Sequence, residues 1–587
     1  MIDLLSVNHI GMSFFQLFGY NQFRKKNERN MKRLIIIITL LFTGCLFLLS
    51  AHMEVFAQDS EEIRLLNSLY RIAGIQRPSI IYPASGDTIR YFIDSSGLRG
   101  HLPSETRLML DDLYMNLGGD DMLLQKGDFG ADLDIPLSLA FQGFIPRPSE
   151  LTYLRSDGSL FDRLPLLSFD LNFAMTYLAF GQFRLDISKR PGTYHESLET
   201  NLILNSGIIQ NIPHAAYISL GTKNINLFIG RRKVSAGRGM TSSMSIGDNF
   251  LYRDAVKLSL HAFPLSYELM FNSFDPEIDS NSKFAWADSG VFHPQLIIHR
   301  ISASLFSKVT LTLYEGLLSW KDNGMFDPKL LNPFMVLHDL FTFFNGNINN
   351  FFGLEADISL PCGLSLHAEG ILDQLQLRKE VGDTSNQTKA EPDAFGLLAS
   401  MQWSRLNGKS MMLVYVESAY TSPALYLKRD FQKENDVIHH YQTDLIVGNN
   451  QHEDAPDVSY IGYKYGPNTV ACETGLELSR LNDCNAYLTC LFRVTGDTGL
   501  GRATDIMHTS FAGKLSPWCS VSANKPEYLL QFTIGGRKAI MNETFYIGAN
   551  ISVQNFWNYR NSKDADKTIT QFSLSASFNP MRLLYQN

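Results

Sequence analysis

The chain has 587 residues, of which 45% are hydrophobic and 12% aromatic, and its formal net charge at pH 7 is −8. This acidic balance excludes a protein that binds nucleic acid through a basic surface. No two of the six cysteines form a C-x-x-C pair, so a zinc site of the usual spacing is excluded. We expect no metal and no cofactor.

Residues 1–57 are predicted to be an export signal with an upstream extension. Two basic residues precede an apolar stretch at residues 34–50, and the small residue Ala57 ends the segment. This order is typical of a secretory signal peptide cleaved after Ala57. The alternatives are a transmembrane anchor and a lipoprotein signal ending at Cys45. Removing residues 1–57 takes away six basic and three acidic residues, which changes the net charge from −8 to −11.

Residues 58–130 are predicted to form a helical region. In residues 60–74 apolar side chains recur at helical spacing, Asp59 or Ser60 can cap the first turn, and Gly74 ends the pattern. Residues 103–119 show a second pattern of this kind, with Ser104 as the expected cap. Amphipathic helices must bury their apolar faces, so we expect these two to pack together or against the rest of the chain.

Residues 131–587 show a hydrophobic period of two. Residues 168–177 alternate between large apolar and mostly polar side chains, and residues 354–360 and 364–368 do the same, with Glu355 and Glu369 at polar positions. Strands of this pattern face an apolar medium on one side and water on the other.

The connections between these strands alternate in length. Between residues 225 and 418, long loops separate tight turns at residues 262–264, 306–308, 361–363 and 405–409. Outer-membrane barrels have short turns on one rim and long loops on the other. We therefore predict an all-β fold, a transmembrane antiparallel β-barrel of roughly 16–18 strands, with the helical region as a small periplasmic plug. A secreted β-sandwich, which also alternates, is the alternative.

A barrel of this kind belongs in the bacterial outer membrane. Its expected surroundings are outer-membrane lipid, and its expected helpers are periplasmic chaperones and the barrel-assembly machinery.

The stretch FIGRRKVSAGRGMTSSMSIGDNF, residues 228–250, contains most of the candidate binding residues. It lacks the further glycine or the Gly-Lys-Ser/Thr of nucleotide-binding loops, so its glycines are expected to allow a sharp turn or a close backbone approach at the barrel rim. Arginine suits the carboxylate of an acidic sugar because its planar fork binds both oxygens. We predict a polysaccharide site formed by Arg231, Arg232, Arg238, Asp248, Asn249 and Trp320.

Two alternatives to this site remain open. The arginines can instead form a salt-bridge network that holds barrel and plug together. Trp320 can instead be an aromatic residue of the membrane interface.

The sequence contains neither Gly-x-Ser-x-Gly nor His-Glu-x-x-His. We therefore expect no catalytic residues and no enzymatic activity.

Several segments, in this order, resemble the capsule-assembly Wzi family of outer-membrane proteins. They are LLNSLYRIAGIQRPSIIYPAS, IGRRKVSAGRGMTSSMSIGDN, FHPQLIIHRISASL with LTLYEGLL, LLNPFMVLHDL with FFGLEADISLPCGLSLHAEGILDQLQL, and YIGYKYGPNTVACETGLEL. The resemblance implies a lectin-like, non-catalytic barrel, plugged by helices, that binds surface polysaccharide and anchors it to the cell. An outer-membrane porin or solute channel and a secreted β-rich hydrolase are the alternative functions.

Overall fold

The computed structural model describes residues 53–581 except for a series of internal segments. These are residues 118–123, 127–128, 147–163, 176–177, 190–197, 203–207, 211–213, 250–251, 275–292, 322–347, 375–393, 424, 431–436, 441, 446–456, 482, 497–524 and 541–543. The predicted signal peptide lies outside the described residues as far as residue 52.

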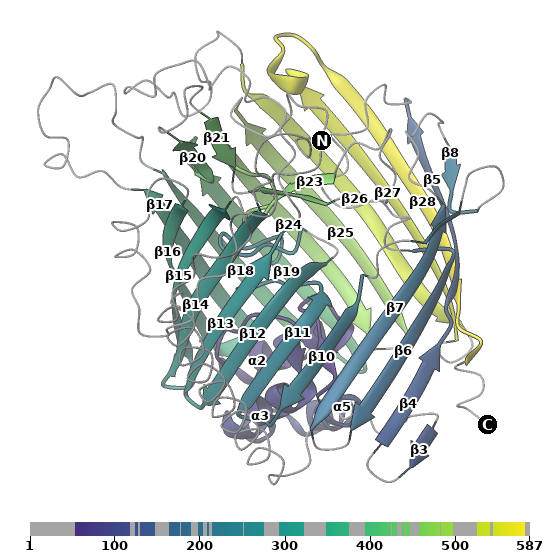
Figure 1. The fold of residues 1–587 in the computed structure, drawn as a ribbon. Coiled ribbons are helices and arrows are strands. Elements are labelled where there is room, and N and C mark those ends of the chain that lie inside the picture. Colours follow the sequence, from purple (N-terminus) through teal and green to yellow (C-terminus); the bar gives the residue numbers. More distant parts are fainter. Residues whose placement is uncertain are drawn as a thin grey trace, which may run out of the picture. The chain divides into compact units, whose positions relative to one another are not determined.

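The described strands form a closed antiparallel β-barrel of 18 strands (Figure 1). Strands β4 and β5, which are two residues apart, together make the first strand, and β5 pairs with the last strand, β28, which closes the barrel. This confirms the expected fold. The wall consists of β4 (Phe129–Asp134), β5 (Leu137–Ile145), β6 (Leu167–Met175), β7 (Ala179–Lys189), β10 (Ala216–Gly221), β11 (Ile225–Arg232), β12 (Arg253–Ala262), β13 (Leu265–Ser273), β14 (His293–Leu305), β15 (Val309–Lys321), β16 (Ile348–Leu360), β17 (Leu364–Gln374), β18 (Ala394–Asn407), β19 (Ser410–Thr421), β24 (Thr469–Arg480), β25 (Cys484–Thr495), β26 (Glu527–Ile540), β27 (Phe545–Trp557) and β28 (Lys567–Phe578).

Shorter strands lie beside the wall or in its connections. They are β1 (Val55–Phe56), β2 (Ala84–Ser85), β3 (Leu124–Lys126), β8 (Leu198–Thr200), β9 (Ile208–Gln210), β20 (Leu427–Asp430), β21 (Val437–His440), β22 (Gln442–Leu445) and β23 (Asp457–Tyr460).

Side chains alternate between the outside of the barrel and its lumen. On the outside, Leu313 of β15 and Leu354 of β16 expose 63% and 51% of their surface. Their neighbours Thr312 and Glu355 are fully buried in the lumen. Because the side-chain period of a strand is two, one face of each strand meets lipid and the other meets the barrel contents.

The helices lie inside the barrel at the end where the short turns are (Figure 1). The Gln76 amide donates to the carbonyl oxygen of Ser307, in the β14–β15 turn, at 2.8 Å. The Tyr91 hydroxyl accepts the amide of Phe263, in the β12–β13 turn, at the same distance. The helices therefore form a plug at the short-turn end of the barrel, the end that faces the periplasm in outer-membrane barrels.

Helix α2 (Glu61–Ala73) has the ends that the sequence predicts. Ser60 caps it by accepting the Ile63 amide, and Gly74 ends it in the left-handed conformation with φ of 67°. Helix α5 (Ser104–Asn116) differs from the prediction, because the Thr106 and Arg107 amides donate to the Pro103 carbonyl. Ser104 is therefore the first helical residue and not the cap.

Two further helices, α3 (Gly86–Ser95) and α4 (Leu98–His101), complete the plug. Its core is formed by Ile63, Leu66, Leu69, Phe92, Leu110 and Leu113. Within the described part of the chain, every helix is too short or too polar to cross a bilayer.

Candidate functional site

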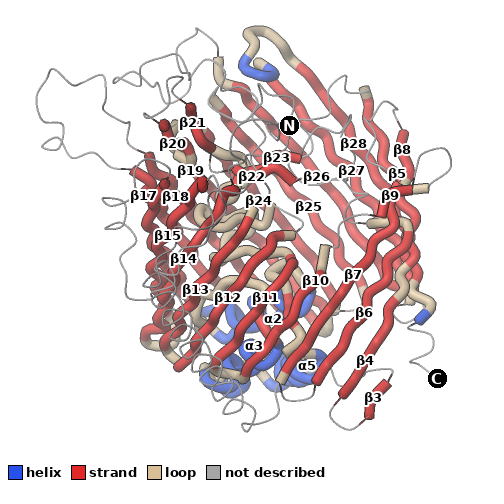
Figure 2. The backbone as a smooth tube through the Cα atoms, viewed as in Figure 1, coloured by secondary structure: helices blue, strands red, loops and turns tan. Residues whose placement is uncertain are grey.

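The glycine-rich stretch turns into the barrel. After β11 the chain continues as residues 233–249, which we call the lumen loop, and tan loop segments lie inside the ring of strands in Figure 2. The Tyr82 amide of the plug donates to the Ser235 carbonyl at 2.8 Å, and the Ala236 amide donates to the Ile246 carbonyl at 3.0 Å. The expectation of a turn at the rim is therefore wrong, because the loop pairs with the plug.

The glycines of the lumen loop serve the two purposes that the sequence predicts. Gly237 has a φ of 78°, in the left-handed region that favours glycine. A Cβ atom on Gly239 would collide with the Ser242 carbonyl, and one on Gly247 would collide with the Gly462 carbonyl. The backbone can therefore pack this tightly only because these residues have no side chain.

Two buried glutamates of the barrel wall hold the plug segment that follows α2. Glu268 of β13 accepts the Ile81 amide at 2.5 Å. Glu355 of β16 accepts the Ser79 hydroxyl at 3.1 Å, and it also pairs with Arg300 of β14, whose Nη1 lies 2.6 Å from its Oε1. Charge-assisted bonds of this kind satisfy carboxylates that have no water around them.

Two more buried glutamates hold the lumen loop. Glu369 of β17 accepts the Met244 amide at 3.0 Å. Glu417 of β19 accepts the amides of Met240 and Thr241 at 2.6 and 2.9 Å. The loop is thus fixed to the wall on one side and to the plug on the other.

Arg231 and Arg232 lie on opposite sides of the wall. Arg231 shares the face of the exposed Ile229, binds Asp254 through Nε at 2.8 Å, and stacks on the Tyr252 ring at 4.3 Å. Arg232 faces the lumen, where its Nη1 donates to the Gln182 side chain at 3.0 Å. Adjacent residues of a strand point in opposite directions.

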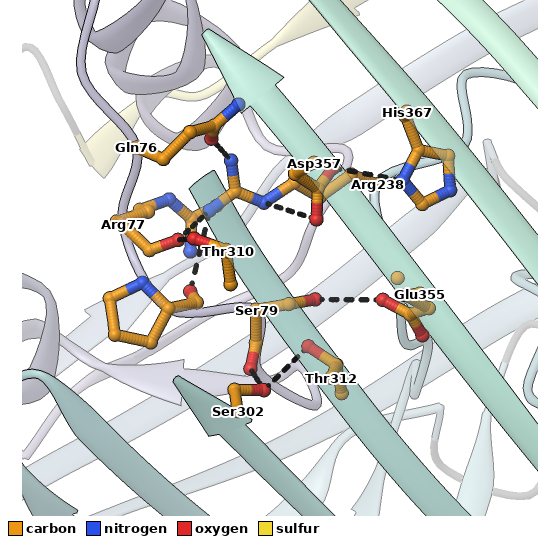
Figure 3. Close-up of polar contacts among 12 residues, drawn as sticks. Gln76, Arg77, Ser79, Arg238, Ser302, Thr310, Thr312, Glu355, Asp357 and His367 are labelled. Carbon is orange, nitrogen blue, oxygen red and sulfur yellow. Dashed lines mark hydrogen bonds and ion pairs between the residues drawn. The ribbon is translucent and has the colours of Figure 1, made fainter. Parts of the chain in front are cut away.

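The other predicted site residues are also spread out. Arg238 bonds to the Gln76 side chain and the Arg77 carbonyl, and its Nε lies 3.9 Å from Asp357 Oδ2 (Figure 3). Asp248 lies 3.6 Å from Lys233, and the Asn249 amide donates to the carbonyls of Tyr460 and Gly462. The Trp320 side chain lies outside the described part of the structure.

Plug, lumen loop and wall meet around a cavity of about 120 Å³. Its lining includes Arg71 of α2, Arg238 of the lumen loop, and Asp357, His367 and Gln402 of the wall. Burial away from water, with a further contribution from the charge of Arg238, lowers the pKa of Arg71 to about 9. These residues come from separate segments, and the sequence carries no signal that they meet.

Aromatic residues paired with cations lie at the opposite end of the barrel, beside the ends of β24–β28. We call Tyr465 and Tyr559 the rim tyrosines. Lys464 and Arg493 lie 4.8 and 5.0 Å from the Tyr465 ring centre, and Lys567 lies 4.6 Å from the Tyr559 ring centre. These residues were not among the predicted site residues, although the string GYKYG at residues 462–466 is a local signal.

Neither a protein-family model nor a curated protein matches the chain. Among solved structures it is similar to Wzi of Escherichia coli, an outer-membrane protein involved in group 1 capsule assembly and a carbohydrate-binding β-barrel. The TM-score is 0.51 at 12% identity, over 89% of this chain and 98% of that one. This likeness shows the fold. The chain has the fold of an outer-membrane β-barrel.

Two other matches have lower scores. OprD of Pseudomonas aeruginosa matches with a TM-score of 0.37 at 8% identity, over 78% of this chain and 99% of that one. The outer membrane channel DcaP of Acinetobacter baumannii matches with a TM-score of 0.32 at 10% identity, over 78% and 99%.

Proposed function

We propose that this protein is a non-catalytic outer-membrane barrel that binds surface polysaccharide and anchors it to the cell. The observation that carries the proposal is the fixation of plug and lumen loop to the wall by Glu268, Glu355, Glu369 and Glu417. A lumen that is filled on one side by buried charge-assisted bonds suits a rigid support better than a passage for solutes. The fold likeness to a carbohydrate-binding barrel supports the same role.

The rim tyrosines are the surface that we assign to the sugar. Tyrosine rings offer flat apolar faces against which sugar rings can stack, and they keep a hydroxyl for hydrogen bonds. Lys464, Arg493 and Lys567 beside these rings can also attract acidic sugar groups.

The proposal is tested by retention of polysaccharide on the immobilised, detergent-solubilised protein. Surface polysaccharide from the cells that make the protein is the probe. We expect Tyr465→Ala combined with Tyr559→Ala to lose retention, while the matched control Tyr528→Ala, on the outer face of β26, keeps it. Unchanged retention by the double variant would overturn the assignment of the rim tyrosines.

A separate variant tests the residues chosen from the sequence. Arg231→Ala combined with Arg238→Ala should lose retention if the arginine-rich stretch binds the glycan. Retention by this variant, together with loss by the tyrosine variant, would place the sugar at the rim alone.

One observation favours a solute channel as the second candidate. Lumen-facing residues on the side away from the lumen loop are only half-buried, namely Gln531, Asn550, Gln571 and Ser573. Water therefore reaches part of the lumen. Conductance in planar bilayers separates the two functions, because an anchoring barrel should give no discrete current steps and a channel should give regular ones.

A further inference from the structure

We infer that the cavity between α2, the lumen loop and the wall is a binding site for a small oxyanion, a carboxylate or phosphate group. This inference goes beyond polysaccharide anchoring and does not depend on it, because the cavity lies beside the plug and the rim tyrosines lie at the other end of the barrel. Arg71 and Arg238 of the lining, the hydrogen-bond donors around them and the size of the space carry it.

Arg71 is buried and has only neutral partners. Its Nε donates to Ser404 Oγ at 2.7 Å, its Nη1 to Gln402 Oε1 at 2.8 Å, and its Nη2 to Ser68 Oγ at 2.9 Å. None of the ion pairs among the described residues includes it. A guanidinium without a counter-charge in a water-poor place is costly unless an anion joins it.

Arg77 does not line the cavity, but its side chain binds Asn67, which does. Its Nη2 donates to Asn67 Oδ1 at 2.7 Å and to the Tyr82 hydroxyl, so its side-chain partners in the described structure are also neutral. Arg238, whose Nη2 donates to the Arg77 carbonyl, brings a further guanidinium to the lining.

Asp357 of the wall faces Arg238, and a second wall carboxylate, Glu417, holds the cavity-lining residues Met240 and Thr241. Asp357 lies 3.9 Å from Arg238 Nε, and its other oxygen is 2.8 Å from His367 Nδ1 (Figure 3). Asp357 is therefore shared between an arginine and a histidine.

The remaining charged residues of the lining have partners of their own. Asp59 and Asp248 both lie within 4 Å of Lys233, and Arg64 pairs with Glu477 at 2.8 Å. The side chains of Asp59 and Arg64 are 42% and 47% exposed, so water screens them and gives access to the cavity on their side.

Two buried nitrogen atoms at the cavity also lack a hydrogen-bond partner among the described residues. They are Nε of Arg238 and Nε2 of His367, and Oδ2 of Asp357 likewise accepts no hydrogen bond from the described residues. The volume of about 120 Å³ is far above the roughly 10–15 Å³ that one water molecule requires. It admits a phosphate ion or the carboxylate end of a uronic acid, but not a folded length of polysaccharide.

Calorimetry on the full, detergent-solubilised chain tests the site with defined probes at constant ionic strength. The probes are inorganic phosphate, glucuronate and, as the neutral control, glucose. We expect saturable binding of at least one of the two anions and none of glucose. Phosphate alone would identify a phosphate site, and glucuronate alone a site for acidic sugar. If neither anion binds the wild-type protein, the inference is overturned.

Arg71→Gln and Arg238→Gln, made separately, should each weaken anion binding about 10-fold or more, as expected for the loss of a charge-assisted contact. Arg99→Gln is the matched control, because the Arg99 side chain on α4 is exposed, and it should bind as the wild type does. Wild-type affinity in both cavity variants would contradict the inference.

Thermal unfolding gives a second readout that a purely structural role of Arg71 would not produce. Without anion, Arg71→Gln should unfold at the same temperature as the wild type or higher, because it removes an unpaired buried charge. With saturating anion the order should reverse, because only the wild type gains stability from the ligand. An order that does not change with anion would also contradict the inference.

Discussion

The pair of Arg300 and Glu355 shows how single side chains join the wall to the plug. Both are fully buried, and Nη2 of Arg300 lies 2.6 Å from Glu355 Oε2 and 2.5 Å from Ser79 Oγ. The pair therefore links β14 and β16 to the plug segment at a place buried from bulk solvent. The net stabilisation by a buried ion pair is small, whereas removing one partner is strongly destabilising because the other charge stays buried and unpaired.

We expect Arg300→Met to lower the free energy of unfolding by about 3–5 kcal/mol, because Glu355 is left as an unpaired buried charge. Adding Glu355→Leu should restore most of the loss. Urea unfolding of the barrel in lipid vesicles measures both effects. The control is Arg99→Met, which breaks an exposed pair with Asp111 and should cost less than about 1 kcal/mol. Equal losses for the two arginine variants would contradict this account of the buried pair.

The alternation of side chains in the sequence was enough to predict that Glu355 faces the lumen. It did not predict that Arg300 is the partner of Glu355. Arg300 is 55 positions away, and only the register of the sheet brings it to Glu355. Because adjacent residues of a strand point to opposite faces, the sequence already indicated that Arg231 and Arg232 do not share one site. Arg238 could be assigned to neither face, because it lies in a loop whose path depends on the plug.

Among the elements, the lumen loop depends on a close approach between two backbones. The Gly247 amide donates to the Ile461 carbonyl at 2.9 Å, and there is no room for a Cβ atom between Gly247 and Gly462. The loop between β19 and β24 thus packs directly on the lumen loop.

Gly247→Ala should destabilise the protein by about 1–3 kcal/mol, because the added methyl group must displace backbone in a well-packed place. It should also raise the ion leak in planar bilayers as the loop moves. Gly100→Ala is the control, since a Cβ atom there meets nothing within 4 Å. Unfolding midpoints in urea and bilayer currents report the two effects. If Gly247→Ala and Gly100→Ala have the same unfolding midpoint and the same bilayer current, the two backbones at Gly247 and Gly462 are not tightly packed.

Elements with strong periodicity were predicted well, and those with mixed faces were not. Both ends of α2 followed from Ser60 and Gly74. The exact number of strands between residues 465 and 510 could not be predicted, because in β24 Cys472 and Thr474 share the outer face with Leu478 and weaken the apolar alternation. Helix α3 was missed because it is short and follows directly on an extended segment rich in proline.

For the whole molecule, the decisive feature is closure of the sheet. Ser138 on β5 and Ser577 on β28 bond side by side at 3.0 Å although they are 439 positions apart. The number of strands followed from the length of the chain, whereas this contact could not be read from local patterns. A closed barrel leaves no unpaired edge, and its outer face must then match the lipid.

A charge introduced on the outer face tests whether that face meets lipid. Leu313→Arg should cost about 2–4 kcal/mol, because it places a guanidinium in the hydrocarbon core of the bilayer. Phe306→Arg is the matched control in the turn before the same strand, where the side chain is 94% exposed, and it should cost about 0–1 kcal/mol, as expected near the interface. Unfolding free energies in lipid vesicles give both values.

The comparison distinguishes a membrane barrel from a secreted β-sandwich with an identical alternation. Leu313 and Phe306 are both largely exposed, so in water an arginine at either position would be tolerated about equally. Only a lipid environment makes the two positions differ, since one lies within the apolar band and the other outside it. Equal costs for the two variants would therefore rule out the membrane orientation, and with it the periplasmic position of the plug.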